Sequence, residues 1–371
     1  MASLAAYVLD FAYTFTSCVA CFPSPSLYIN NRSYKIQRLL GEGGFSYVYL
    51  VQAQNGELFA LKKIRCPFGA ESLQVAMKEI DNYKIFHDEH IISMIDSNVV
   101  QERDGSKTVY ILLPYFRRGN LQDTINANLI NGSYYDEKEA LLLFLDIARG
   151  VRVMHKHTLG GANGSSTGNS SRNSGVGMDI EAERPLMASE PADFQNAPQS
   201  LAAPGSAADT RIVAYAHRDI KPANIMLSQT GVPVLMDLGS CMRARIDVSS
   251  RGQALEIQDN AAEHCTMPYR APELFDVKTN TILDEGVDIW SLGCTYFAML
   301  YCSSPFELQT AETGASLSLA IINGTFRFPD APKYSEPTKE IIRACLTVEP
   351  SQRPDIDKVI SLIESSLAQF N

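Results

Sequence analysis

A series of short motifs between residues 215 and 354 restricts what this chain can fold into. The motifs are Tyr215-Ala-His-Arg-Asp-Ile-Lys-Pro-Ala-Asn-Ile225, Val234-Leu-Met-Asp-Leu-Gly239, Thr266-Met-Pro-Tyr-Arg-Ala-Pro-Glu273, Asp288-Ile-Trp-Ser-Leu-Gly293 and Arg353-Pro354. The probability that all of them occur by accident in this order is negligible. A fold for this chain has to account for all of them together.

A glycine-rich stretch before these motifs reads Leu39-Leu-Gly-Glu-Gly-Gly-Phe-Ser-Tyr-Val-Tyr49. A Rossmann-type turn needs a third glycine and an immediate helix, whereas position 46 is serine and a strand rich in Val and Tyr follows. A Walker loop is absent because no Gly-Lys-Ser/Thr follows. Two interpretations remain, a hairpin that covers phosphates with its backbone N–H groups and a tight glycine hairpin without a ligand.

Lys62 lies within the apolar strand pattern of residues 58–64. By itself it could be a surface lysine on an edge strand. A helix with an apolar face follows and carries Glu79. Because a buried lysine needs a counter-charge, Glu79 is its natural partner across the sheet. Residues 109–113 then read as a buried strand, and a chain reversal follows before Gly119.

Composition and charge exclude several classes of function. The 371 residues carry 32 Lys and Arg against 42 Asp and Glu, a net charge of -10. This balance argues against nucleic-acid binding, which needs concentrated basic residues, and against holding an anionic membrane by charge alone. The eight cysteines form no paired CxxC motifs, so we expect no zinc site and a reducing environment.

The chain divides into regions of different composition. Residues 1–31 are apolar and aromatic with a single charge, Asp10, whereas residues 158–210 are rich in Gly, Ser, Asn, Ala and Pro. We expect the 158–210 insertion to be disordered, because it cannot bury enough apolar surface to offset chain entropy. No run of 18 charge-free apolar residues exists, and no basic residue precedes Arg32. Neither a membrane-spanning helix nor a secretory signal is therefore predicted.

Taken together, the motifs resemble those of the eukaryotic protein kinases over about residues 33–365, apart from the insertion. The resemblance implies an α+β bilobal protein kinase fold, with a small β-rich N-lobe and hinge (33–116), a large helical C-lobe (117–365) and a helical activation segment. It implies an ATP-dependent serine/threonine protein kinase that uses Mg²⁺, with Mn²⁺ as a substitute. We expect a monomeric catalytic unit that acts on protein substrates bearing Ser or Thr.

The resemblance also assigns residues to ATP. Lys62 holds the α- and β-phosphates, and Glu79 fixes Lys62. The adenine ring bonds to the backbone of Pro114 and Phe116, with Leu113 as the gatekeeper behind it. The residues implied in ATP binding are Gly41, Glu42, Gly43, Gly44, Phe45, Ser46, Val48, Ala60, Lys62, Glu79, Leu113, Pro114 and Phe116.

The catalytic motifs receive roles in the same way. Asp219 orients the substrate hydroxyl and accepts its proton, while Lys221 meets the γ-phosphate. Asn224 and Asp237 coordinate magnesium, whose hard character favours oxygen ligands. Thr266 braces Asp219 and, with Lys221, is typical of Ser/Thr rather than Tyr kinases.

Other matched residues are expected to support the fold. Glu273 and Arg353 resemble the buried ion pair that anchors the end of the activation segment, and Asp288 resembles the residue that bonds the catalytic-loop backbone. His217 is expected to pack in the core of that loop. We interpret the remaining paired histidines as ordinary helix-end and surface residues, namely His87, His90, His155 and His157.

Two positions depart from the family pattern. Ser46 stands where many kinases have the third glycine, and Leu238 replaces a common phenylalanine. Serine is small and leucine fills a core position equally well, so neither change predicts inactivity. The alternative to an active kinase is a catalytically weak pseudokinase-type scaffold at a membrane.

A narrower resemblance is to the Numb-associated kinase family. It is based on residues 41–48, 113–119, 234–240 and 265–273. Within that family the chain is most similar to the branch that holds an acylated Golgi serine/threonine kinase of animals and its yeast vacuolar-membrane relative. This branch implies a role in membrane traffic or in vacuole or Golgi organisation, on the cytoplasmic face of such a membrane. The physiological substrate is not readable from the sequence.

The N-terminal segment, residues 1–31, is predicted to anchor the chain to a membrane. Its apolar residues follow helical spacing, and they are Leu4, Val8, Phe11, Phe15, Cys18 and Phe22. Position 2 is alanine, so the N-myristoylation signal is missing. We expect S-palmitoylation of Cys18 and Cys21, because stable anchoring generally takes two signals. The alternative is that residues 1–31 pack on the kinase domain with both cysteines buried.

The activation segment contains a second helix signal. Ser250 and Gln253 have the spacing of a capping box, and the residues that follow are compatible with a short amphipathic helix. A structured segment implies activity without an activation-loop phosphate, so that Arg218 need not find a phosphorylated residue. The alternative is a flexible loop that phosphorylation at Ser249, Ser250 or Thr266 would order.

Overall fold

The computed structural model describes residues 26–43, 46–67, 70–159 and 211–370. Cys18, Cys21, Gly44 and Phe45 lie outside these ranges, as do residues 160–210 of the predicted insertion. The chain divides into two compact units. One combines the residues up to His157 with those from Val213 onward, and the small one is formed by Thr158–Ile212.

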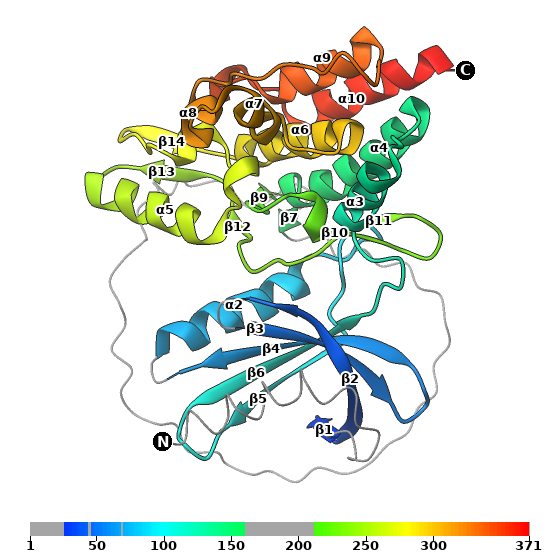
Figure 1. The fold of residues 1–371 in the computed structure, drawn as a ribbon. Coiled ribbons are helices and arrows are strands. Elements are labelled where there is room, and N and C mark those ends of the chain that lie inside the picture. The colour runs from blue at the N-terminus through cyan, green and yellow to red at the C-terminus, as the bar shows by residue number, and fades with distance from the viewer. Residues whose placement is uncertain (1–25, 44–45, 68–69, 160–210, 371) are drawn as a thin grey trace, which may run out of the picture. The chain divides into compact units, whose positions relative to one another are not determined.

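A six-stranded antiparallel sheet forms the N-lobe of the larger unit (Figure 1). Its strands lie in the order β1-β2-β3-β4-β6-β5, and they are β1 (Ser26–Ile29), β2 (Arg32–Glu42), β3 (Ser46–Ala53), β4 (Leu58–Cys66), β5 (Asp96–Gln101) and β6 (Lys107–Pro114). Alternate side chains point to opposite faces. One face encloses a small core of Ile29, Tyr34, Val51, Leu61, Tyr110 and Leu112. The other face packs against α2 (Ala70–Ile85).

The sheet begins earlier in the chain than the sequence predicts. The predicted anchor covers residues 1–31, but Ser26–Ile29 form β1 and pair in antiparallel register with residues 32–35. The reversal between the two strands uses Asn30 and Asn31, both with positive φ (44° and 67°), a conformation that asparagine tolerates better than most residues. The N-lobe therefore includes the end of the predicted anchor.

The C-lobe is built mainly from helices. They are α3 (Leu121–Asn131), α4 (Glu137–His155), α5 (Arg251–His264), α6 (Gly286–Tyr301), α7 (Pro305–Thr313), α8 (Leu317–Ile322), α9 (Glu336–Cys345) and α10 (Ile356–Leu367). Local side chains explain several helix starts. Asn120 and Asp123 form a reciprocal capping box at α3, and Asp136 accepts two backbone N–H bonds at α4, which satisfies donors that have no partner inside the helix.

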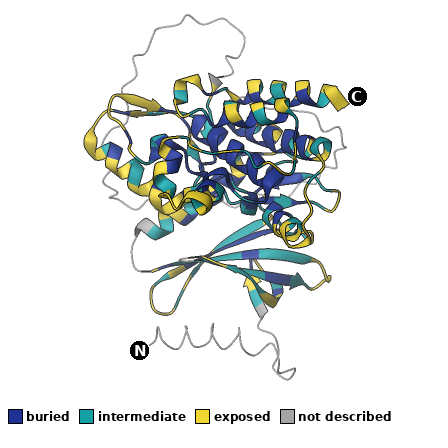
Figure 2. Ribbon diagram, turned by 45° about the horizontal axis from the view of Figure 1, so that its top comes forward, coloured by how far each residue is buried: buried dark blue, intermediate teal, exposed yellow. Residues whose placement is uncertain are grey.

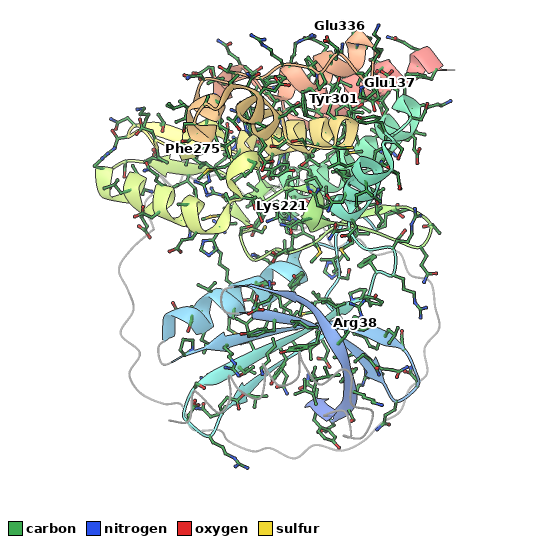
Figure 3. All side chains as sticks on the ribbon, in the orientation of Figure 1. Arg38, Glu137, Lys221, Phe275, Tyr301 and Glu336 are labelled. Carbon is green, nitrogen blue, oxygen red and sulfur yellow. The ribbon has the colours of Figure 1, made fainter. Side chains whose placement is uncertain are left out.

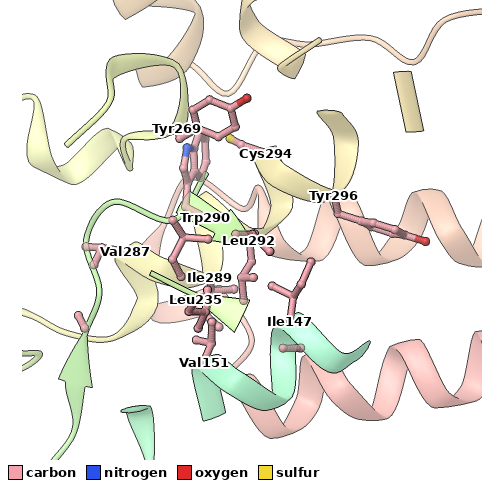
Figure 4. Close-up of a cluster of buried hydrophobic side chains, with 14 of the residues drawn as sticks. Ile147, Val151, Leu235, Tyr269, Val287, Ile289, Trp290, Leu292, Cys294 and Tyr296 are labelled. Atoms are coloured by element: carbon pink, nitrogen blue, oxygen red, sulfur yellow. The ribbon is translucent and has the colours of Figure 1, made fainter. Parts of the chain in front are cut away.

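Helix α6 is the centre of the C-lobe, because every residue from Gly286 to Tyr301 is buried (Figures 2 and 4). Trp290 stacks on Phe306, and Tyr296 stacks on Phe144 of α4. Gly293 allows α9 to approach, since a Cβ at this position would lie 2.7 Å from the Cβ of Cys345. A helix that is apolar on all sides can only be stable when neighbours cover all of it.

Between its helices, the C-lobe contains two-stranded ladders and 3₁₀ turns. The two-stranded ladders pair β9 (Tyr215–Ala216) with β12 (Met242–Arg243), β10 (Ile225–Leu227) with β11 (Pro233–Leu235), and β13 (Ile246–Val248) with β14 (Thr281–Leu283). The 3₁₀ turns are η2 (Pro222–Asn224), η3 (Met267–Tyr269), η4 (Pro272–Leu274), η5 (Pro350–Gln352) and η6 (Ala368–Phe370). The predicted bilobal α+β fold with a helical activation segment is confirmed.

The small unit contains one described ladder. Its strands are β7 (Thr158–Leu159) and β8 (Arg211–Ile212), with Thr158 opposite Ile212 and Leu159 opposite Arg211. Residues 158 and 159 are therefore a strand, although the sequence places them in a disordered insertion. In the larger unit, the Val213 N–H donates to the carbonyl of His157 (2.7 Å), so the chain ends on either side of the ladder already lie together.

Deleting residues 162–206 should leave the fold and the turnover almost unchanged. The ladder of β7 and β8 stays in place, and shortening a loop changes its closure entropy only slowly with length, so we expect the melting temperature to move by at most about 2–4 °C. Calorimetry and a steady-state rate assay measure both quantities. A chain with the same residues in scrambled order is the control, and a large loss in the deletion variant alone would show that the insertion contributes to the folded domain.

Candidate active site

The register of the N-lobe sheet brings the predicted nucleotide residues onto one face. Val48 pairs with Gly41 on one side and with Lys62 on the other, and Ala60 pairs with Leu113. Directly paired residues and residues two apart share a face. Val48, Ala60, Lys62 and Leu113 therefore line the same side of the sheet.

The glycine-rich stretch forms a hairpin between β2 and β3. The Gly43 N–H donates to the Ser46 carbonyl (2.8 Å), and Glu42 pairs with Tyr47. A Cβ at Gly41 would meet no atom within 4 Å, so packing inside the protein does not require glycine there, whereas a phosphate lying close to the backbone would. At the other end of this face, Pro114 closes β6, and Phe116 follows in a turn where the Gly119 N–H donates to its carbonyl (3.2 Å).

Lys62 joins the two lobes through two carboxylates. Its Nζ lies 2.7 Å from Oε1 of Glu79 on α2 and 3.0 Å from Oδ1 of Asp237 in the C-lobe. The Tyr83 hydroxyl also donates to Glu79 Oε1 (3.1 Å). The ion pair between Lys62 and Glu79 that the sequence predicts is therefore present, and Asp237 shares the same amine.

The charges of this group depend on one another. Burial opposes the charge on Lys62, but the carboxylates of Asp237 and Glu79 outweigh it and hold the pKa of Lys62 above its ordinary value. Burial also opposes the charge on Asp237, but Lys62 outweighs it and holds the pKa of Asp237 below its ordinary value. Burial raises the pKa of Glu79, against the opposite effect of Lys62. Lys62 and Asp237 are thus charged at neutral pH.

Asp219 is fixed by four hydrogen bonds. Its Oδ1 accepts from the backbone N–H (2.9 Å) and hydroxyl (2.7 Å) of Thr266, and its Oδ2 accepts from Lys221 Nζ (2.7 Å) and Asn224 Nδ2 (2.9 Å). Lys221 lies where the C-lobe faces the N-lobe sheet (Figure 3) and also donates to the Thr266 hydroxyl (2.6 Å). The predicted contact between Thr266 and Asp219 is present, and the four donors set the direction of the carboxylate.

Asn224 and Asp237 suit a magnesium ion. The Asn224 amide nitrogen donates to Asp219, which leaves the amide oxygen for another partner, and only Oδ1 of Asp237 binds Lys62. Within the described residues no group of three or more His, Cys, Asp or Glu could hold a metal. Mg²⁺ typically takes only one or two protein ligands and completes its shell with water and substrate phosphates, so this pair fits the ion.

A cavity of about 550 Å³ opens at these residues. Its lining includes Lys62, Glu79, Asp219, Lys221 and Asp237, together with the end of α5 and the segment that follows it. The residues predicted to hold adenine do not line it, so the cavity is the phosphate and acceptor end of the predicted cleft.

The buried carboxylate of Asp288 binds the backbone of the catalytic loop. It is fully buried in the first turn of α6, and its two oxygens accept from the backbone N–H groups of His217 (2.7 Å) and Arg218 (2.8 Å). Arg218 has a positive φ of 68°, an uncommon conformation for a residue with a side chain. The two bonds hold that conformation, as the sequence predicts for Asp288.

His155 lies at the end of α4, as expected for a helix-end histidine, but it is not a surface residue. His155 is 1% exposed, and its Nε2 lies 3.0 Å from Oδ2 of Asp288. The local pattern at the end of α4 does not show this contact, because its partner lies far along the chain. Burial opposes the charge on Asp288, but the bond to His155 outweighs it and lowers the pKa of Asp288.

Sequence reasoning also missed Asn82. The Asn82 side chain is buried and donates to the backbone carbonyls of Leu238 and Cys241, both at 2.8 Å. It therefore ties α2 to the chain that follows Asp237. The available signal was an amide within the apolar face of a helix, since a buried polar side chain has to find a partner.

The activation segment is pinned at several points. β12 and β13 pair with strands outside the segment, and α5 lies between them and Thr266. Ser250 caps α5 as predicted, because its hydroxyl accepts from the Gln253 N–H (3.2 Å). The capping box is not completed. The Gln253 side chain accepts from the Ser249 N–H (2.9 Å) instead and donates to the Asp247 carbonyl.

The end of the activation segment is anchored by a buried ion pair. Arg353 Nη1 and Nη2 lie 2.8 and 3.1 Å from the two carboxylate oxygens of Glu273, and the guanidinium carbon lies over the Trp290 ring, 5.3 Å from its centroid. Arg353 also donates to the carbonyls of Gly286 and Thr347. The predicted pair between Glu273 and Arg353 is present, and it joins the segment to α6.

Asp288→Asn should destabilise the protein most near neutral pH. An amide cannot accept all the hydrogen bonds of the buried carboxylate, and breaking such a buried pair costs about 3 kcal/mol, or several degrees in melting temperature. Because the folded-state pKa of Asp288 lies below its ordinary value, its contribution to stability is fully present above the ordinary pKa of an aspartate and is lost as the pH falls through the lowered folded-state pKa.

The measurement is thermal unfolding of wild type and variant across pH. The difference in melting temperature should be largest near neutral pH and shrink under strongly acidic conditions. Asp276→Asn is the matched control, because Asp276 is an exposed partner of Lys278. Equal melting temperatures for wild type and Asp288→Asn at neutral pH would contradict the role given to this carboxylate.

Comparison with known proteins agrees with this geometry. A profile of the protein kinase domain matches residues 34–159 and 213–362. The chain is 41% identical over 359 residues to the serine/threonine-protein kinase ENV7 of Saccharomyces cerevisiae, covering 94% of this chain and 95% of that protein. It is 33% identical over 341 residues to the human serine/threonine-protein kinase 16, covering 92% of each. The chain therefore belongs to the protein kinase family, among relatives that are named serine/threonine-protein kinases.

Proposed function

We propose that the residues described above transfer the γ-phosphoryl group of ATP to a Ser or Thr hydroxyl of a protein substrate. The observation that supports this most is the double contact of Lys62 with Glu79 and Asp237, next to an Asp219 carboxylate held by four donors. Phosphoryl transfer needs little covalent work from the protein and much positioning and charge stabilisation. The site supplies both.

The N-lobe face would hold the nucleotide. The backbone N–H groups of the glycine hairpin cover the phosphates, and Lys62 contributes the charge that binds the α- and β-phosphates. Adenine bonds to the carbonyl of Pro114 and to the backbone of Phe116, and proline is compatible there because only its carbonyl is used. Leu113, which is 4% exposed, closes the space behind the ring.

The C-lobe residues would act on the acceptor. Asn224 and Asp237 would hold magnesium, which would supply positive charge against the phosphates. Asp219 orients the substrate hydroxyl and accepts its proton while the hydroxyl oxygen bonds to the γ-phosphorus and the bond to the ADP oxygen breaks. Lys221, which bridges Asp219 and Thr266, stabilises the transferred group.

Lys62→Met and Asp219→Asn should each abolish phosphoryl transfer. Loss of the phosphate-binding charge or of the proton acceptor each costs on the order of 10²–10⁴ in rate. Transfer of labelled phosphate from ATP and Mg²⁺ to a generic Ser/Thr substrate measures this. Lys358→Met and Asp259→Asn are the controls, because both residues are exposed and neither lines the cavity at the site. A wild-type preparation that neither binds nucleotide nor transfers phosphate would favour a pseudokinase scaffold.

We infer that activity does not require phosphorylation of the activation segment. Two ladders, α5 and the pair of Glu273 with Arg353 already hold the segment. Arg218 is only 6% exposed, so it is not open to a phosphate from solvent.

Enzyme treated with phosphatase should therefore keep most of its activity. The assay compares initial rates before and after treatment, with mass spectrometry to verify that Ser249, Ser250 and Thr266 carry no phosphate. Ser249→Ala serves as a matched variant that cannot be phosphorylated at this one position. Loss of nearly all activity on dephosphorylation would instead support a loop that phosphate orders.

We also propose that S-acylation of Cys18 and Cys21 holds the kinase on the cytoplasmic face of a vacuolar or Golgi membrane, with a role in membrane traffic or organelle organisation. No described helix is long and apolar enough to cross a bilayer. The support comes from the sequence, where apolar residues at helical spacing accompany the two cysteines. Each buried CH₂ of an acyl chain adds about 0.8 kcal/mol of membrane affinity, so two chains suffice where one gives only marginal binding.

Cys18→Ser/Cys21→Ser should move the kinase from the membrane pellet to the supernatant. Each single substitution should retain partial binding, because one acyl chain is a reversible anchor. Cell fractionation measures the distribution, and hydroxylamine-sensitive labelling of thioesters reports the acylation itself. Full retention of the double variant in the pellet would show that these cysteines do not anchor the chain.

A further inference from the structure

The N-lobe sheet nearly closes on itself, because its two edge strands meet. β1 and β5 are the outer strands of the sheet order, yet the Asn30 side chain at the end of β1 donates to Asp96 Oδ1 (2.8 Å) and to the Ser97 carbonyl (3.0 Å). We call this junction the β1–β5 seam. It lies at the end of the N-lobe away from the C-lobe helices (Figure 1).

The outer side of the seam exposes apolar side chains. Leu27 and Ile29 pack into the N-lobe core, so Tyr28 between them points outward, and it is 66% exposed. On β5, Val100 packs on the same core, so Val99 points outward and is 40% exposed. Ile95, two residues before Ser97, is 43% exposed.

The same outer side also carries a lysine. Tyr28 pairs with Ser33, and Ser26 pairs with Lys35, so the exposed Lys35 shares the face of Tyr28. We define the seam face by its outward positions Tyr28, Ser33, Lys35, Ile95, Ser97 and Val99. None of them is acidic, although the chain has 42 acids against 32 basic residues.

The proposed anchor enters the fold at this face. β1 begins at Ser26, and residues 22–25 separate it from Cys21. Because a chain extends by at most about 3.5 Å per residue, acyl groups on Cys21 would keep Ser26 within about 18 Å of the anchored thioester. The seam face therefore includes the strand that directly follows the proposed anchor along the chain.

We propose that the seam face lies against the lipid headgroup region of the membrane. This inference rests on the proposed acyl anchor. Tyrosine favours the membrane interface, where its ring is apolar and its hydroxyl is hydrated, and lysine can keep its ammonium at the headgroups while its stem lies on apolar surface. The N-lobe would then rest on the bilayer, with the C-lobe helices on the side away from it.

A tryptophan probe tests the contact. Trp290 is the single tryptophan and is fully buried, so Tyr28→Trp adds a probe of the seam face over a constant background. The full chain is coupled through its thiols to phosphatidylcholine vesicles that contain maleimide lipid and brominated acyl chains. The described cysteines are all buried, and failure of Cys18→Ser/Cys21→Ser to couple verifies the attachment point. Tyr134→Trp, at an exposed C-lobe position (46%), is the matched control.

Coupled Tyr28→Trp should lose roughly half of its added emission to the brominated lipid, whereas Tyr134→Trp should lose almost none. Adding Ile95→Ser and Val99→Ser to Tyr28→Trp should restore much of the emission without lowering the melting temperature, because both residues are exposed. Equal quenching at positions 28 and 134 in coupled protein would overturn the proposal. A second result would also overturn it: emission from position 28 that is already blue-shifted before vesicles are added and that brominated lipid does not quench. This result would mean that the chain itself covers the seam face.

The chemical coupling separates this inference from the proposed anchor. If the cysteines are not acylated in cells, fractionation shows it, while the coupled protein still reports whether the seam face meets lipid. If acylation occurs but coupled Tyr28→Trp is not quenched, the anchor holds and the seam contact is wrong.

Discussion

The buried carboxylate of Asp288 is the contact on which the geometry of the catalytic loop depends. Helix α6 is enclosed on all sides, so its first turn is a fixed point for everything attached to it. From there Asp288 binds the backbone of His217 and Arg218 and the ring of His155. The bonds keep Arg218 in a left-handed conformation that a residue with a side chain adopts only when its surroundings hold it there. That conformation directs the next residue, Asp219, toward Thr266 and Lys221.

Charge, rather than packing alone, connects the two lobes at the site. The N-lobe has its own small core, and Lys62 reaches from its sheet to Asp237 in the C-lobe. Asn82 adds two bonds from α2 to the same stretch of chain. Each contact joins a side chain of the N-lobe to the segment after β11. The position of α2 and the direction of Asp237 are therefore set together, which is what a site that places phosphates between lobes requires.

The activation segment shows how a polar connection becomes ordered without a modification. Each of its parts uses a partner outside it, first the strands β9 and β14, then Asp219 for Thr266, and finally Arg353 for Glu273. Arg353 thereby attaches the C-terminal end of the segment to the buried α6, and α5 spans the stretch between β13 and Thr266. At the opposite end of the molecule, β1 is tied to β5 by Asn30, so the residues that enter the fold from the N-terminal segment are part of the N-lobe sheet.

The residues proposed to perform chemistry could be located from the sequence because they stand in short motifs that resemble those of protein kinases. The resemblance named Asp219, Lys221 and Asn224, and the structure places the side chains of Lys221 and Asn224 on the Asp219 carboxylate. Hydrophobic alternation likewise predicts the strands and the apolar face of α2. What these patterns do not contain is the identity of a distant partner. In the structure, His155 is a buried partner of Asp288, the Gln253 side chain bonds to Ser249 and Asp247, and residues 26–29 are a strand of the sheet. In each case the local pattern indicates only that a polar group needs a hydrogen-bond partner or that an apolar side chain needs to be buried. Many distant segments could meet that need. The tertiary structure decides which segment does, because a single packing has to meet the needs of every group at once.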